Sequence, residues 1–298
     1  MACEASLRSY ETIQAKRLTP HIGAEISGID LTKPLDERQI RDIRQALLDH
    51  LVIFFREQPI DVATLKAFGQ HFGKLHIHQL KGMEGHPEVR PLHADANSKH
   101  VAGEDWHTDL SCDAIPPMGS ILHIHTLPPT GGDTIWTSMY AAYDALSPRM
   151  QAYLEGLTAT HDGGPVFRLF NPGGKYPVSV HPVIVKHPET KRKAIYVNRA
   201  FTSHINEVPP KESAAVLAFL YAHCESPLYA VRFQWRKNSI AFWDNRSTQH
   251  YATYDYGGAR RKVQRVTTVG SLPLGVDGRP SKPLQGDPAA YYQGLDRA

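Results

Sequence analysis

Two histidine–aspartate pairs, each with one residue between the partners, lie close together in the sequence. His107 and Asp109 form one pair in "DWHTDL", and His93 and Asp95 form the other in "LHADA". Residues i and i+2 of a strand point the same way, so either pair could direct an imidazole and a carboxylate at one ion. Two imidazoles and one carboxylate are the ligands typical of a non-haem iron(II) site. The chain has 17 histidines, so one such pair is expected by chance.

The third ligand must come from a distant part of the chain. His250 follows a predicted strand and an Asp-Asn turn in "WDNRSTQHYATYDY", so only the fold could bring it to His107. A zinc hydrolase that binds its metal through two histidines and an aspartate, with one position open for water, is an alternative. The candidate ligands alone therefore predict a metal site without fixing its chemistry.

The stretch "ARRKVQRVTTVG", which follows His250, alternates as a strand. Its pattern places Arg261, Val263, Arg265 and Thr267 on one face. Two arginines on an inward face would be costly unless anions pair with them. Guanidinium groups hold carboxylates and sulfonates in forked hydrogen bonds, which fits one arginine for a dicarboxylate co-substrate and one for the substrate. Arginines that face outward into surface salt bridges are the alternative.

The elements that must position these residues are mainly short strands. In the first part of the chain, the apolar spacing predicts strands over 23–31 and 51–57 and helices over 36–51 and 61–73, with Asp61 as an N-cap. Further strands are predicted over 119–127, 131–139, 178–187, 193–198, 229–235, 239–245 and 262–270, and further helices over 138–157 and 210–224. The strands do not alternate one-for-one with helices, which favours a sandwich or barrel with helices packed outside.

Length and composition are those of one folded domain. The chain has 298 residues, of which 41% are hydrophobic and 21% charged, as in ordinary globular proteins. All-β domains often reach about 250 residues as one unit. We expect a single domain over 1–298, with an N-terminal extension over 1–17 and an extended C-terminal tail over 271–298 that is rich in proline and glycine.

Charge and cysteine content exclude several classes of partner. The formal net charge of +3 is spread along the chain without a long basic run, so neither nucleic acid nor an anionic membrane is expected. The N-terminus lacks the apolar stretch of a signal peptide, and no run of about 18 apolar residues could span a bilayer. The three cysteines form no CxxC motif. This usage favours a reducing, cytoplasmic setting.

At this point the chain resembles the taurine dioxygenase (TauD/TfdA) family. The resemblance spans about residues 18 to 275 and rests on motifs that occur in order, among them "IGAEISGIDLTKPL", "FGKLHIH", "WHTDLS", "PPTGGDTIWTSMYAAYDALSP" and "WDNRSTQHYATYDYGGARRKVQRVT". Members are iron(II)- and 2-oxoglutarate-dependent oxygenases on a double-stranded β-helix, or jelly roll. The resemblance implies an α+β, mainly β, jelly-roll core with flanking helices, and a homo-oligomer, either dimer or tetramer.

The resemblance also implies roles for individual residues. The iron ligands would be His107, Asp109 and His250. The contacts to the distal carboxylate of 2-oxoglutarate would be Thr134 and Arg261. The contacts to the anionic head of the substrate would be His78 and Arg265. Residues that shape the site before the last ligand would be Trp243, Asp244 and Asn245. The rival pair at 93 and 95 falls in the variable stretch before the triad, where we expect a loop.

The implied reaction couples oxidative decarboxylation of 2-oxoglutarate by O2 to hydroxylation of a small organic anion. Asp109 favours hydroxylation, because the related halogenating enzymes have a small residue there. Taurine-cleaving members hold the substrate amine with a tyrosine and an asparagine, where this chain has Lys81 and Gly103, so taurine itself is disfavoured. A sulfonate or alkyl sulfate ester is favoured, and an aryloxyalkanoate is the alternative. A non-enzymatic jelly-roll binding protein is the alternative of a different class.

Overall fold

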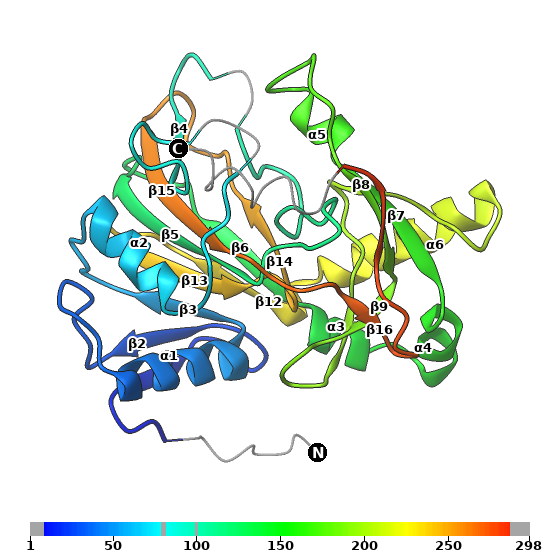
Figure 1. The fold of residues 1–298 in the computed structure, drawn as a ribbon, viewed down its shortest axis with the longest axis horizontal. Helices are drawn as coiled ribbons and strands as arrows, with labels where there is room; N and C mark the ends of the chain where they lie inside the picture. The colour runs from blue at the N-terminus through cyan, green and yellow to red at the C-terminus, as the bar shows by residue number, and fades with distance from the viewer. Residues whose placement is uncertain (1–8, 79–81, 99–100, 287–298) are drawn as a thin grey trace.

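A seven-stranded sheet forms the centre of the computed structural model, which describes residues 9–78, 82–98 and 101–286 (Figure 1). In spatial order its strands are β1 (Gln14–Arg17), β2 (Ala24–Ser27), β3 (Val52–Phe55), β13 (Ile240–Asp244), β5 (Gly119–Thr126), β15 (Arg261–Thr268) and β4 (Arg90–Ala94). Strands β2 and β3 pair in parallel, and every other neighbouring pair in this sheet is antiparallel. Segments from both ends of the chain therefore build one sheet.

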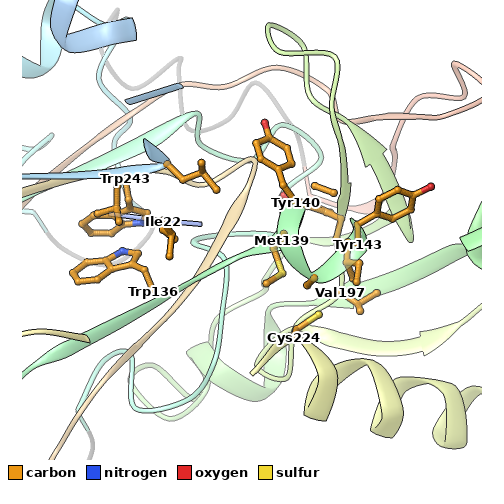
Figure 2. Packing of buried hydrophobic residues seen from close by; sticks show 14 of the residues in the cluster. Ile22, Trp136, Met139, Tyr140, Tyr143, Val197, Cys224 and Trp243 are labelled. Carbon is orange, nitrogen blue, oxygen red and sulfur yellow. The ribbon is translucent and has the colours of Figure 1, made fainter. Parts of the chain in front are cut away.

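Three smaller sheets complete the β structure. One contains β12 (Ala230–Phe233), β6 (Thr134–Ser138) and β14 (Thr248–Ala252). The second contains β11 (Thr202–Ile205), β7 (Thr158–Asp162), β8 (Val178–Pro182) and β17 (Lys282–Gln285), and the third β10 (Lys193–Ile195), β9 (Ile184–Lys186) and β16 (Leu274–Gly275). Trp136 of β6 packs against Trp243 of β13 with ring centroids 5.6 Å apart (Figure 2). This contact joins the first small sheet to the large one, and the predicted jelly-roll core is confirmed.

Two helices cover one face of the large sheet. The apolar side of α1 (Glu37–His50) and that of α2 (Val62–Gln70) pack in one buried cluster with Phe55 and Phe242 of the sheet (Figure 1). Asp61, the predicted N-cap, accepts a hydrogen bond from the first turn of α2, and Asp36, which the sequence analysis did not name as a cap, does the same for α1. The remaining helices are α3 (Met139–Asp144), α4 (Pro148–Leu154), α5 (Gly164–Phe167), α6 (Pro210–Cys224) and the 3₁₀ turn η1 (Pro227–Tyr229).

Several predicted elements are interrupted or shorter in the structure. The helix predicted over 138–157 divides into α3 and α4, because Ser147 caps a new helix that starts at Pro148. The strand predicted over 178–187 divides into β8 and β9. The helix predicted to reach Gly73 ends at Gln70.

Two segments near the predicted metal site are strands where we expected none. "LHADA" was predicted as a loop, but His93 lies in β4, which forms the edge of the large sheet. His250, predicted to follow a strand, lies within β14. Both strands are defined by antiparallel pairing with distant segments, β4 with β15 and β14 with β6. Sequence periodicity does not contain that information.

Both predicted terminal segments contribute strands. Residues 14–17 of the predicted N-terminal extension form β1, which pairs with β2. Within the predicted tail, β16 pairs with β9 and β17 pairs with β8, so this part of the tail lies along the domain (Figure 1). Among the residues that the structure describes, no helix is both long and apolar enough to cross a membrane.

Candidate active site

The fold brings His107, Asp109 and His250 together. His107 forms an isolated bridge with β14, in which its amide donates to the His250 carbonyl at 3.1 Å and the His250 amide donates to the His107 carbonyl at 2.8 Å. One candidate ligand atom from each of the three side chains lies within 4.8 Å of the others. Over the described ranges this is the one such group of three or more residues, and the rival pair at 93 and 95 is not part of it.

The protonation states of Asp109 and His250 and the orientation of His107 suit a divalent metal. Burial and the neighbouring His107 hold the pKa of His250 well below its usual range, so its imidazole is neutral. Burial by itself would raise the pKa of Asp109, but Arg265, His250 and His107 outweigh it and hold that pKa well below its usual range. His107 directs Nδ1 at the Asp105 carbonyl, 2.7 Å away, which leaves Nε2 for a ligand bond. Neutral imidazoles and an ionised carboxylate are the forms that bind metals, so these residues fit Fe(II).

A chain of hydrogen bonds fixes the Asp109 carboxylate. Arg265 Nη1 donates to Oδ1 at 2.7 Å, and the Ser120 hydroxyl donates to Oδ2 at 2.8 Å. Asn245 Nδ2 donates to the Ser120 oxygen at 3.1 Å, and Trp243 Nε1 donates to Asn245 Oδ1 at 2.9 Å. Trp243 and Asn245, predicted to shape the site, thus act on Asp109 through Ser120, which sequence reasoning missed. Such outer contacts orient the ligands of metal sites.

A cavity of about 380 Å³ opens beside the three candidate ligands. Its polar lining includes Arg90, Arg261 and Arg265, and its apolar lining includes Leu92, Val166, Phe167, Leu169 and Phe170. The prediction that the two arginines of β15 face inward is therefore confirmed, and the surface alternative is wrong. A cavity of this kind suits a ligand with an anionic end and an apolar body.

Thr134 and Arg261 both line the cavity and both adjoin Trp235. The Thr134 hydroxyl accepts a hydrogen bond from Trp235 Nε1 at 3.0 Å. The Arg261 guanidinium lies 6.0 Å from the centre of the Trp235 ring, and its Nε donates to the Gly132 carbonyl at 3.2 Å. Burial lowers the pKa of Arg261. The structure thus brings the two predicted 2-oxoglutarate contacts to one wall, with an indole that the sequence analysis did not single out.

His78 and Arg265 are joined by a third residue, Arg90, which sequence reasoning missed. Arg90 Nη1 lies 2.6 Å from His78 Nε2. Because a guanidinium only donates, this nitrogen of His78 accepts. Burial, with Arg90 and Arg265 nearby, holds the pKa of His78 well below its usual range. His78 is therefore neutral and does not supply a positive charge to the cavity.

Gly103 packs directly against a candidate metal ligand. Its φ is +92°, and a Cβ at this position would lie 3.3 Å from His107 Cε1. A side chain there would combine a strained backbone with a contact on the imidazole. The amine contact offered by an asparagine at this position is thus replaced by a close backbone approach. Lys81, the other position that disfavours taurine, lies outside the described residues.

Known proteins resemble this chain along nearly its whole length. A family model described as "Taurine catabolism dioxygenase TauD, TfdA family" matches residues 14–267. The alkylsulfatase of Acinetobacter baylyi is 33% identical over 299 aligned residues, which cover 91% of this chain and 90% of that protein. The α-ketoglutarate-dependent sulfate ester dioxygenase of Pseudomonas putida is 32% identical, over 88% of this chain and 91% of that protein.

A solved structure agrees with these relatives. The crystal structure of a taurine dioxygenase from Burkholderia xenovorans superposes with a TM-score of 0.85 and 38% sequence identity, covering 97% of this chain and 100% of the other. Fold, cavity and the matched residues point to one family of enzymes that use iron(II), 2-oxoglutarate and O2. The chain belongs to the taurine catabolism dioxygenase TauD, TfdA family.

Proposed function

We propose that this dioxygenase hydroxylates the carbon next to the sulfonate or sulfate-ester group of a small organic anion. The observation that carries the proposal is the buried Arg265 guanidinium, which lies beside the candidate metal ligands in a cavity with apolar walls. A positive charge at that place favours an anionic head close to the metal, with the apolar body along the walls. The alkylsulfatase and sulfate ester dioxygenase activities of the relatives support this substrate class.

The proposed residue roles are those that the family resemblance implies, and the positions of these residues around the cavity support them. His107, Asp109 and His250 would hold Fe(II), which supplies the oxidising chemistry together with 2-oxoglutarate and O2. The distal carboxylate of 2-oxoglutarate would lie at Thr134 and Arg261. The anionic head of the substrate would lie at Arg265 and His78.

The proposed reaction accounts for its products. One atom of O2 enters the substrate as a hydroxyl group and the other enters succinate, while 2-oxoglutarate loses CO2. A hydroxyl on a carbon that bears a sulfonate expels sulfite and leaves an aldehyde. A hydroxyl beside a sulfate ester expels sulfate in the same way. The protein positions the reactants.

The first test of the proposed function is spectroscopic and chemical. The protein with Fe(II) and 2-oxoglutarate under anaerobic conditions is expected to show a weak visible charge-transfer band. After O2 is admitted, succinate is expected with sulfonates or alkyl sulfates, measured by chromatography across a panel that also contains aryloxyalkanoates. Neither band nor succinate, with metal binding unchanged in H107A, would contradict the assignment.

Thr134→Val is expected to raise the KM for 2-oxoglutarate about tenfold and to leave the KM for the substrate nearly unchanged, because one hydrogen bond to a carboxylate is lost. Kinetic titration of each reactant measures the two constants. Thr137→Val is the matched control, since Thr137 lies on the same strand but donates to the Cys224 carbonyl. If both variants change the KM for 2-oxoglutarate to the same extent, Thr134 does not bind the carboxylate of 2-oxoglutarate.

We also propose that the protein works as a homo-oligomer in the cytoplasm, without nucleic-acid or membrane partners. The family resemblance supports the oligomer. Cys112 and Cys224 are buried, free thiols. Burial raises the pKa of both thiols, which is typical of unreactive structural cysteines.

A further inference from the structure

We propose that Arg90 is a second anchor for the anionic head of the substrate. Arg90 and Arg265 together would select a tetrahedral oxyanion, a sulfonate or sulfate ester, over a planar carboxylate. This inference rests on the proposed function and narrows its substrate class. It concerns a residue for which the family resemblance implied no role.

The two arginines are direct neighbours across a pair of strands. In the antiparallel pairing of β4 with β15, Arg90 lies opposite Arg265. Residues opposite each other have Cβ atoms roughly 5 Å apart, and like charges at such positions repel. Both side chains line the cavity. The fold therefore places two positive charges on one patch of the cavity wall.

Among the described residues, little balances the positive charge of Arg90. Asp109 forms an ion pair with Arg265 at 2.7 Å. Arg90 contacts the neutral His78, and among the described residues no carboxylate forms an ion pair with it. Burial and the repulsion from Arg265, opposed only in part by the charge of Asp109, lower the pKa of Arg90 to about 9. A buried charge without a counter-ion is costly, and an anionic ligand in the cavity would remove that cost.

The number of donors points to a head with three oxygens. A carboxylate has only two oxygens, whose lone pairs lie in one plane, so two guanidiniums can share it only when both lie near that plane. A sulfonate or sulfate ester has three terminal oxygens in a tetrahedral array, so it can accept from two guanidiniums at once. Arg265 is 7% exposed, and its Nε is buried without a hydrogen-bond partner among the described residues. Arg90 and Arg265 both line the cavity in which such a head would bind, and Arg265 Nη1 also holds Asp109.

The experiment compares two heads on one chain. Hexanesulfonate and heptanoate carry the same hexyl group on a tetrahedral and a planar head. Calorimetric titration under anaerobic conditions, with Fe(II) and 2-oxoglutarate bound, gives Kd for each. Arg90→Gln is expected to raise the Kd of hexanesulfonate about 10- to 100-fold, because hydrogen bonds to a charged group are lost, and that of heptanoate by less than about threefold. Equal changes for both heads, or none, would overturn the proposal.

Arg199→Gln is the matched control. Arg199 also lines the cavity, but its guanidinium is half-exposed and already pairs with Glu225 at 2.8 Å. We expect both dissociation constants to stay within about twofold of wild type, because this charge is already balanced by a carboxylate. If R199Q raised the Kd of hexanesulfonate as much as R90Q does, the overall positive charge of the cavity, and not the pair of Arg90 and Arg265, would bind the head.

A second variant separates contact with the substrate from support of His78. If Arg90 served only to hold His78, adding R90Q to the H78A variant would leave Kd for hexanesulfonate unchanged. Direct contact predicts a further rise of about fivefold or more in the double variant. The melting temperature of R90Q without ligand should not fall, because the repulsion with Arg265 is removed.

The inference and the proposed function fail in different ways. If the wild-type protein forms no succinate from any sulfonate or sulfate ester, the proposed function is wrong, whatever the binding constants are. If succinate forms and R90Q weakens both heads alike, the reaction stands and the arginine pair is not the basis of selection.

Discussion

His107→Ala is expected to lower the affinity for Fe(II) by about 100-fold or more and to remove substrate-dependent succinate formation. Three candidate ligand atoms lie within 4.8 Å of one another, and the variant leaves two of them. Changes one step further out at metal sites already cost about 10- to 100-fold in affinity or activity. Titration of Fe(II) under anaerobic conditions, followed by the visible band with 2-oxoglutarate, measures the affinity.

His93→Ala is the control for this prediction. His93 belongs to the other histidine–aspartate pair, and in the structure it is exposed on β4. Its removal is expected to leave the Fe(II) affinity within about twofold of wild type, as is usual for surface substitutions away from a site. An equal loss in both variants would show that the pair at 93 and 95 contributes to the metal site. Unchanged iron binding in H107A would remove the proposed triad.

Local sequence features could not distinguish the pair His107 and Asp109 from the pair His93 and Asp95. Both pairs have the same spacing, and both lie in segments with weak secondary-structure signals. What separates them is the backbone bridge between His107 and His250, residues that are distant in the chain. Only the resemblance to a family selected the first pair before the structure was known, because spacing within a strand says nothing about which strand lies opposite.

The inward direction of the two arginines of β15 was predictable, whereas the role of Arg90 was not. Alternation along β15 put Arg261 and Arg265 on the face that now lines the cavity. The strand that carries Arg90 is short, contains a proline and lies at the edge of the sheet, where proline is tolerated. Such a segment reads as a loop, so the partner that faces Arg265 was missed.

The helix starts were more predictable than the contacts behind the ligands. Asp61 marked the start of α2 in the sequence because a cap is a local arrangement of a few consecutive residues. Asn245 reaches Ser120 only because β13 and β5 are neighbours in the sheet. Ser120, in "MGSILHIHT", has no local sequence feature that distinguishes it from other buried serines and threonines.

Arg265→Ala is expected to destabilise the metal-free protein by roughly 3 kcal/mol, because it leaves Asp109 buried without its ion-pair partner. That is the low end of the usual cost, since the loss of repulsion with Arg90 offsets part of it. The melting temperature should fall by about 5 to 10 °C. Calorimetric or fluorescence melting of the metal-free variant measures the change. The same variant should raise the KM for the substrate, because an anchor of the anionic head is lost.

The metal dependence of this loss distinguishes a ligand carboxylate from an ordinary buried one. Fe(II) added under anaerobic conditions should restore most of the stability of R265A, because a dication at Asp109 replaces the missing guanidinium. Arg246→Ala breaks another buried ion pair, in which Arg246 contacts Asp244 at 2.6 Å. The loss of stability in R246A should persist when Fe(II) is added, because Asp244 is not among the candidate ligands. If Fe(II) restored the stability of both variants equally, or of neither, the stability loss in R265A would not be linked to metal binding at Asp109.

The pH dependence of R265A follows from the same pair. The folded-state pKa of Asp109 lies below its unfolded value, because Arg265 and the two histidines outweigh the effect of burial. A depressed acidic pKa contributes stability above the unfolded pKa, near 4, and that stability is lost as the pH falls through the folded pKa. The wild-type advantage over R265A should therefore be full at neutral pH and shrink below about pH 4. An advantage that grew in acid would contradict an ionised Asp109 held by Arg265.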